Sequence, residues 1–212
     1  MKKAWVLIPM LMILIAGLAI KKANGSLFKT AASRNVLTAS PFDQAHRNKL
    51  SQKGQAALAF AKSHAFNTSY CFLIDMSLPS GQDRFFVYLM NTDSIRAAGL
   101  VTHGRCNEEW LEGRKYGNTV GCGCTSLGKY RIGNSYTGRF GKAFKLYGLE
   151  KTNDKAFDRY VVLHAHECVP SRETKEEICQ SDGCPTVAPD FLKRLDPLIR
   201  QSDRPVLLWI FE

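Results

Sequence analysis

The chain has 212 residues, of which 45% are hydrophobic and 23% charged, a composition ordinary for a globular protein. This composition excludes a mostly disordered chain, a fibrous protein and one that crosses a membrane many times. The formal net charge is +10, and the seven cysteines are an odd number that is high for a reduced cytosolic protein. Six cysteines can pair and leave one thiol, so the sequence raises the question of which one stays free.

The amino terminus has the pattern of an export segment. Lys2 and Lys3 precede an apolar run from Ala4 to Ile20, and small residues follow near Gly25. Residues 1–25 therefore predict a secretory signal peptide or an uncleaved signal anchor, since seventeen apolar residues are just enough to span a bilayer. Both interpretations export the remainder to the periplasm or cell envelope, where disulfides form.

The charge balance indicates which partners to expect. Residues 1–25 carry four of the ten net positive charges, so the exported portion remains basic. A basic surface outside the cytosol suits an anionic cell envelope rather than nucleic acid. We expect contact with a membrane only through the N-terminal segment.

The exported portion divides into a tether, residues 26–41, and one domain over residues 42–212. Apolar spacing predicts a helix over residues 42–65. Strands are then expected, the first two as a hairpin, at residues 70–76, 84–90, 100–103, 129–132, 144–149, 160–166 and 206–211.

A late helix is predicted from apolar residues spaced at helical intervals between Val187 and Ile199. Pro189 suits its first turn, and Pro197 is expected to kink the helix or end it early. The order of one helix, many strands, a late helix and a last strand predicts a β-rich α+β domain.

Chemically reactive side chains are densest between residues 164 and 185. His164 ends an apolar strand, and Cys184 stands between Gly183 and Pro185 at a sharp turn before the late helix. Such a turn exposes the sulfur, lets backbone N–H groups approach a substrate carbonyl and lowers the thiol pKa near the helix start. We interpret the two residues as a Cys–His pair for nucleophilic catalysis. On spacing alone, a disulfide for Cys184 and a core position for His164 stay open.

Two other classes of function use the same region. A zinc site is the first, although the spacing is not that of a standard finger and export disfavours clusters of free thiolates. A non-catalytic envelope-binding protein is the second, because a fold does not fix a function. The candidate zinc ligands are His164, His166, Cys168, Cys179 and Cys184.

His164, followed after sixteen residues by Ser181-Asp182-Gly183-Cys184, resembles the His…Ser-x-Gly-Cys signature of the L,D-transpeptidase (YkuD-type) catalytic domain. The likeness is greatest to its murein branch, in which proline follows Gly-Cys. Further segments resemble that branch in the same order, namely Ile74–Ser80, Thr102–Gly104, Thr125–Tyr130, Tyr136–Gly138 and Leu146–Leu149, with Asn153 and Arg159. The resemblance covers residues 42–212 and implies an L,D-transpeptidase-like sheet or barrel domain.

The resemblance implies acyl transfer on peptidoglycan stem peptides through a thioester, with no metal or organic cofactor. Cys184 would be the nucleophile, and His164 the general base and then the general acid. Backbone N–H groups around Gly183 and Cys184 would hold the oxyanion, and Ser181 would shape the turn. An L,D-carboxypeptidase, which uses water instead of an amine, remains an alternative.

The chain departs from the family pattern after the cysteine. Many members carry an arginine two residues on, where this chain has Thr186. Substrate carboxylates would then bind elsewhere, and Arg139 and Arg159 are the candidates. His103 is a further candidate for substrate contact, and His166 supplies a second imidazole on the strand that carries the proposed base.

Cys168 and Cys179 bracket a polar loop between the proposed base and nucleophile. A disulfide between them would close about a dozen residues and stabilise the fold by about 3 kcal/mol through chain entropy. We expect this disulfide, and it would also fix the loop beside the site.

Four further cysteines then have to pair. Cys122 and Cys124 are too close in sequence to pair with each other, so each is expected to pair with Cys71 or Cys106, in an order that the sequence leaves open. This scheme leaves Cys184 as the only free thiol.

Overall fold

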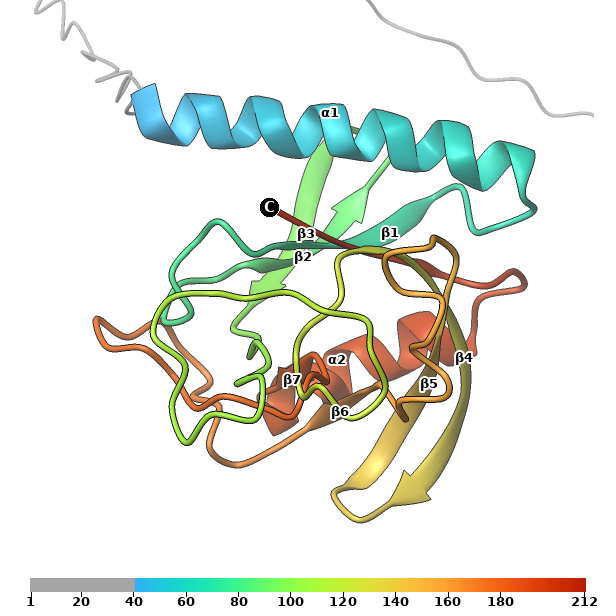
Figure 1. The fold of residues 1–212 in the computed structure, drawn as a ribbon. Helices are drawn as coiled ribbons and strands as arrows, with labels where there is room; N and C mark the ends of the chain where they lie inside the picture. Colours follow the sequence, from blue (N-terminus) through green and yellow to red (C-terminus); the bar gives the residue numbers. More distant parts are fainter. Residues whose placement is uncertain (1–40) are drawn as a thin grey trace, which may run out of the picture. The chain divides into compact units, whose positions relative to one another are not determined.

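The computed structural model describes residues 41–212, so the expected export segment and nearly all of the tether lie outside the described residues. Eight strands form one mixed sheet in the order β3-β2-β1-β8-β4-β5-β6-β7, which confirms the β-rich α+β class (Figure 1). Within residues 41–212, neither helix is long and apolar enough to cross a membrane. The elements are α1 (Pro41–Ser63), β1 (Tyr70–Asp75), β2 (Phe85–Leu89), β3 (Ser94–Gly99), β4 (Gly128–Gly138), β5 (Gly141–Gly148), β6 (Val162–Ala165), β7 (Thr186–Val187), α2 (Pro189–Arg200) and β8 (Leu207–Phe211).

Strand β1 lies inside the sheet, antiparallel to β2 and parallel to β8. Because successive side chains of a strand point to opposite faces, each face of β1 receives alternate residues. Phe72 and Ile74 enter one core cluster, and Cys71 and Leu73 enter another. The nearly continuous apolar sequence of this strand follows from burial on both faces.

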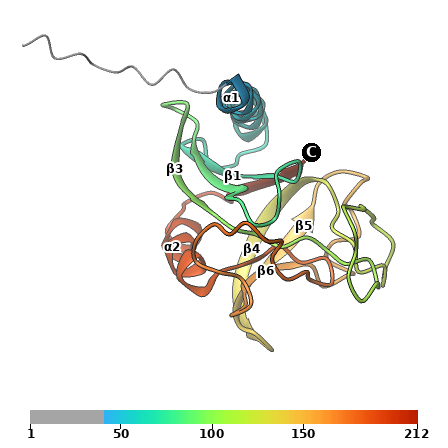
Figure 2. The same ribbon diagram turned by 90° about the vertical axis from the view of Figure 1, so that its left-hand side faces the viewer.

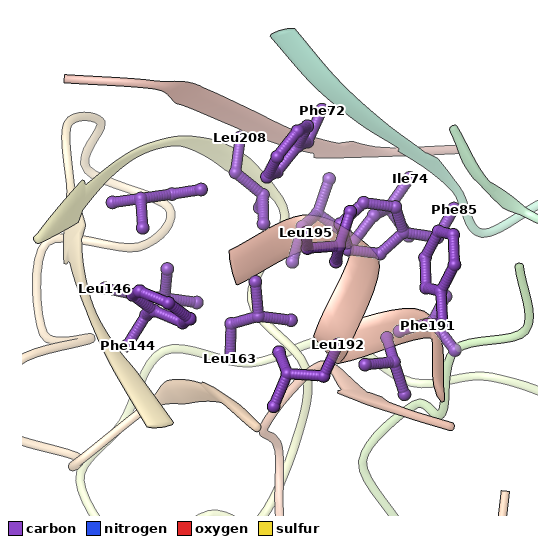
Figure 3. Packing of buried hydrophobic residues seen from close by; sticks show 14 of the residues in the cluster. Phe72, Ile74, Phe85, Phe144, Leu146, Leu163, Phe191, Leu192, Leu195 and Leu208 are labelled. Carbon is purple, nitrogen blue, oxygen red and sulfur yellow. The ribbon is translucent and has the colours of Figure 1, made fainter. Parts of the chain in front are cut away.

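The two helices cover opposite faces of this part of the sheet (Figure 2). Helix α1 packs Leu50 and Ala57 into the cluster that holds Cys71 and Leu73. Helix α2 buries Phe191 and Leu195 in the other cluster, where the Phe191 ring meets Phe85 edge to face at a centroid distance of 5.2 Å (Figure 3). The larger core therefore lies between α2 and the strands that lead to the candidate site.

Two of the expected strands, the third and the fourth, differ in extent. The third strand is β3 at 94–99, and at 100–103 there is only an isolated bridge from Val101 to Val187. The small and polar residues of β3 have weak strand propensity. This strand therefore forms at the edge of the sheet by pairing with β2. Strand β4 extends to Gly138 and continues into β5 through the two-residue turn Arg139–Phe140.

Helix α2 begins at Pro189 as expected, but it does not end at Pro197. The helix continues to Arg200, and the backbone N–H of Gln201 donates to the carbonyl of Pro197 at 3.0 Å. An interior proline removes one N–H donor and crowds the preceding turn, and burial of the helix on the sheet offsets that cost.

Two disulfides are present among the seven cysteines. The expected bond between Cys168 and Cys179 is one of them. The other joins Cys106 to Cys124, which is one of the pairings that the sequence left open.

The expectation that Cys184 is the only free thiol is wrong, because Cys71 and Cys122 are also free. Cys71 lies on the face of β1 beneath α1, in a core cluster that contains no second cysteine. Burial raises the pKa of its thiol to about 12. Cys71 is therefore a small apolar core residue, as buried free cysteines usually are.

We predict that a small alkylating reagent labels Cys122 and Cys184 in the folded protein and Cys71 only after unfolding without reduction. The reason is that Cys71 is buried, whereas the other two thiols are partly exposed. Peptide mass spectrometry locates the labels. Labelling of Cys106 or Cys168 in the unfolded, unreduced protein would contradict the observed pairing.

Candidate active site

Ser181 and Gly183 shape the turn that carries Cys184. The hydroxyl of Ser181 donates to the carbonyl of Cys184 at 2.7 Å and accepts the N–H of Gly183 at 3.2 Å. Gly183 has a φ of +104°, and a Cβ there would lie 2.6 Å from the carbonyl oxygen of Cys124. Only glycine fits this position without moving the backbone.

A second segment, residues 102–105, runs beside the turn and fixes its position. The N–H of Ser181 donates to the carbonyl of His103 at 2.9 Å, and the N–H of Arg105 donates to Ser181 at 2.8 Å. The N–H of Thr102 reaches the carbonyl of Thr186 at 2.9 Å. The turn is therefore bonded through its backbone on both sides of Cys184.

The parallel pairing of β6 with β7 places His164 opposite Thr186. The His164 Nδ1 atom lies 3.1 Å from the carbonyl oxygen of Ala165, and Nε2 lies 3.0 Å from the hydroxyl of Thr186. A carbonyl can only accept, so we assign the proton to Nδ1, which leaves Nε2 with a lone pair. His164 and Cys184 both line one cleft, so the imidazole and the thiol border the same space.

The environment of the pair favours its neutral form. Burial raises the pKa of the Cys184 thiol, and the negative charge of Asp182 raises it further. The N–H of Val162 and the positive charge of Arg159 lower the pKa, but burial is the largest effect. Burial lowers the pKa of His164, the hydrogen bond to Ala165 opposes this, and His166 adds to it. Both shifts favour a thiol with a neutral imidazole over an ion pair.

A cleft of about 420 Å³ opens over the two side chains. Thr102 and Thr186 lie with them along the cleft, and the Cys168–Cys179 disulfide contributes to its wall. Trp110 and Phe140, both exposed, lie on the lining as well. The remaining polar and charged residues of the lining are Arg105, Glu109, His166, Gln180, Ser181 and Asp182.

Phe140, from the turn between β4 and β5, lies against the imidazole. Its ring is stacked on His164 at a centroid distance of 5.1 Å with the planes 16° apart, and it meets His166 edge to face at 5.4 Å. Such contacts restrict the orientation of the imidazole and shield it from water. This hairpin was not predicted, although Gly138 and Gly141 flank a two-residue turn and are the sequence signal that could have indicated it.

Two expected substrate contacts are not where the sequence placed them. Arg159 donates to the carbonyl of Gly117 at 2.9 Å and also to Ser126 and Cys124, so its guanidinium is used within the protein. His103 is buried, its Nδ1 lies 3.2 Å from the guanidinium of Arg84, and it does not line the cleft. Burial together with the nearby arginines lowers the pKa of His103 to about 4. Both side chains therefore contact other parts of the protein, and neither lines the cleft.

The other two expected contacts do lie at the surface of the site. His166 is exposed and lines the cleft, with its Nδ1 accepting the N–H of Cys168 at 3.1 Å. Arg139 lines a second cavity of about 190 Å³ that also reaches Cys184 and His164.

Sequence reasoning missed the loop that carries Trp110. Gln180 holds this loop through two hydrogen bonds of 2.9 Å to the backbone of Leu111. Arg105 forms an exposed ion pair with Asp182 at 2.8 Å, beside the nucleophile turn. No sequence pattern signals these contacts, because they join segments about 70 residues apart.

The zinc interpretation loses two of its five candidate ligands, since Cys168 and Cys179 are bonded to each other. Within residues 41–212, no group of three or more His, Cys, Asp or Glu side chains is arranged to hold a metal ion.

Residues 43–209 match the family model of the L,D-transpeptidase catalytic domain. The chain belongs to this family. A search of curated proteins found no match. Membership in the L,D-transpeptidase family supports an activity on peptidoglycan, and enzymes of this family are typically found in the cell envelope.

We predict that the rate of Cys184 alkylation rises with pH through an inflection above about 8.5, the ordinary thiol value. Burial raises the pKa of this thiol, so little thiolate forms at neutral pH. The measurement is the rate of iodoacetamide labelling at Cys184 from pH 5 to pH 10. A plateau reached already near pH 6 would indicate a thiolate–imidazolium pair and contradict the neutral site.

Proposed function

We propose that this L,D-transpeptidase family member forms a thioester on Cys184 with a peptidoglycan stem peptide and transfers the acyl group to an amine. The observation that carries the proposal is that His164, with the proton assigned to Nδ1, lines the same cleft as the Cys184 thiol. The Nδ1 bond to Ala165 keeps the proton away from Nε2, so the imidazole acts as a base without first losing a proton.

In the first step the sulfur of Cys184 attacks the carbonyl carbon of the L,D amide while Nε2 of His164 takes the thiol proton. The Thr186 hydroxyl bonds to Nε2 in the resting site, and its oxygen also lies 3.4 Å from the carbonyl of Cys184. When Nε2 becomes protonated, this hydroxyl has a second acceptor within reach. Thr186 thereby keeps the base oriented without leaving a buried hydroxyl unpaired.

The oxyanion is held by the backbone N–H of Cys184 in this proposal. The N–H of Gly183, expected to share this role, already donates to Ser181. The N–H of Cys184 contacts no acceptor in the part of the chain that the structure describes. A free donor next to the sulfur is the arrangement that stabilises charge on an attacked carbonyl.

Collapse of the intermediate breaks the C–N bond, and His164 gives its proton to the leaving amine of the terminal D-residue. An amine of another stem peptide then attacks the thioester, forming a new amide and returning the proton to the sulfur through His164. With water in place of the amine, the same residues would perform L,D-carboxypeptidase hydrolysis.

The domain assignment forms part of this proposal. Residues 1–25 would export the chain as a signal peptide or signal anchor, residues 26–41 would form the tether, and residues 42–212 would form the catalytic domain. Cell-wall remodelling in the periplasm or cell envelope would be its task.

We predict that Cys184→Ala abolishes cross-linking of tetrapeptide muropeptides, because no other group in the cleft can form the thioester. Cys122→Ala is the matched control, since Cys122 is also a partly exposed free thiol and should retain wild-type activity. Chromatography with mass spectrometry measures the products.

Cross-linked dimers would support transfer to an amine, and tripeptides alone would indicate the carboxypeptidase. Full activity of Cys184→Ala would contradict the assignment of the nucleophile. Binding to sacculi with no product at all would favour the non-catalytic alternative.

A further inference from the structure

Three cysteines gather in the segment between β3 and β4, and one of them is free. Cys106 is bonded to Cys124, and Cys122 is a partly exposed free thiol two residues before Cys124. The surroundings of Cys122 therefore differ from those of Cys71, whose core cluster contains no second cysteine. A thiolate that lies beside a disulfide can attack it and exchange one bonded partner for another.

The segment that carries Cys106 is bonded to the backbone on both sides of Cys122. The N–H of Cys106 donates to the carbonyl of Gly123 at 3.0 Å, and the side-chain amide of Asn107 donates to the carbonyl of Gly121 at 2.9 Å. Gly123 has a φ of +63°, and a Cβ there would lie 2.6 Å from the Oδ1 atom of Asn107. A glycine at this position therefore lets the two segments pack closely, with Cys122 between the two contacts.

The sulfur of Cys122 lies close to the disulfide itself. The backbone N–H of Cys124 donates to the Sγ atom of Cys122 at 3.4 Å. A Cβ built on Gly117 would lie 3.3 Å from Cys122 Sγ and 3.4 Å from Cys124 Sγ, so the two sulfurs border the same small space. The sulfur of Cys106 is bonded directly to that of Cys124. The free thiol and both atoms of the disulfide are thus gathered at one place.

This cysteine cluster adjoins the candidate active site. The carbonyl of Cys124 accepts a hydrogen bond from Arg159, whose charge acts on the nucleophile thiol. Arg105, which precedes Cys106, donates its N–H to the carbonyl of Ser181 at 2.8 Å. Each half of the disulfide therefore belongs to a segment that is bonded to a residue of the site.

We propose that Cys106, Cys122 and Cys124 form a thiol–disulfide exchange site in which Cys122 is the attacking thiol. The Cys122 thiolate attacks Cys106 Sγ, the bond from Cys106 to Cys124 breaks as the bond to Cys122 forms, and the Cys124 thiolate leaves and takes up a proton. One disulfide and one thiol are present before and after this step, so it needs no external oxidant or reductant. The pairing of Cys106 with Cys124 is the more populated form, and Cys106 stays bonded in both.

The test maps the disulfides of the wild-type protein. The folded protein is held at pH 8, where thiolates form, and is then unfolded at pH 6 in excess N-ethylmaleimide, which traps free thiols while exchange is slow. After digestion without reduction, fragmentation in the mass spectrometer shows whether Cys122 or Cys124 carries the label. A minor species, about 1–10% of the molecules, should carry the label on Cys124 and the bridge on Cys122.

Two variants separate the two forms. In Cys124→Ser the first partner is removed, so Cys106 should be bonded to Cys122 and neither should be labelled after unfolding without reduction. Cys122→Ser is the matched control, which should keep the observed bridge and carry no label on Cys106 or Cys124.

A wild type labelled on Cys122 alone would overturn the exchange site, as would labels on both Cys106 and Cys122 in folded Cys124→Ser protein. The map of the wild type decides the question even where Cys124→Ser does not fold. It uses no peptidoglycan substrate, so its result is independent of the proposed acyl transfer.

Discussion

The parallel pairing of β6 with β7 is the contact on which the candidate site depends. It sets His164 opposite Thr186 and thereby fixes the imidazole relative to the turn that ends at Cys184. Strand β7 has only two residues, too few to hold a register alone. Its position comes from neighbours on both sides, since Thr102 bonds to Thr186 and His166 bonds to Val187 through the backbone. A shift of one residue would turn the base away from the cleft.

Burial and charge act in opposite directions on the thiol. Burial raises the pKa of Cys184, while Arg159 lowers it from behind the turn. The same guanidinium bonds to the carbonyls of Gly117 and Cys124, so one partly buried cation both joins the loops and acts on the thiol through its charge. A thiol that stays protonated at rest is less readily oxidised, and a neutral imidazole in the same cleft can activate it during attack.

Much of this arrangement could be predicted from local sequence. The glycine before Cys184, the apolar strand before His164 and the spacing of Cys168 and Cys179 each reflect a local constraint, and the structure contains a turn, a strand and a disulfide at these places. The errors concern contacts between distant segments. Arg159 and His103 looked available for substrate, yet each is held by backbone or arginine partners that no local pattern reveals. Cys71 was expected to form a disulfide, but its strand packs against α1, where no other cysteine is near.

The central claim is that Cys184 carries the acyl group during turnover. The most direct test is to incubate the protein with a tetrapeptide donor, stop the reaction in acid and map the modified peptide by mass spectrometry. We predict a thioester adduct on the peptide that contains Cys184, with a mass equal to the donor less its terminal D-residue. Product formation with no adduct, or an adduct confined to Cys122, would contradict the account.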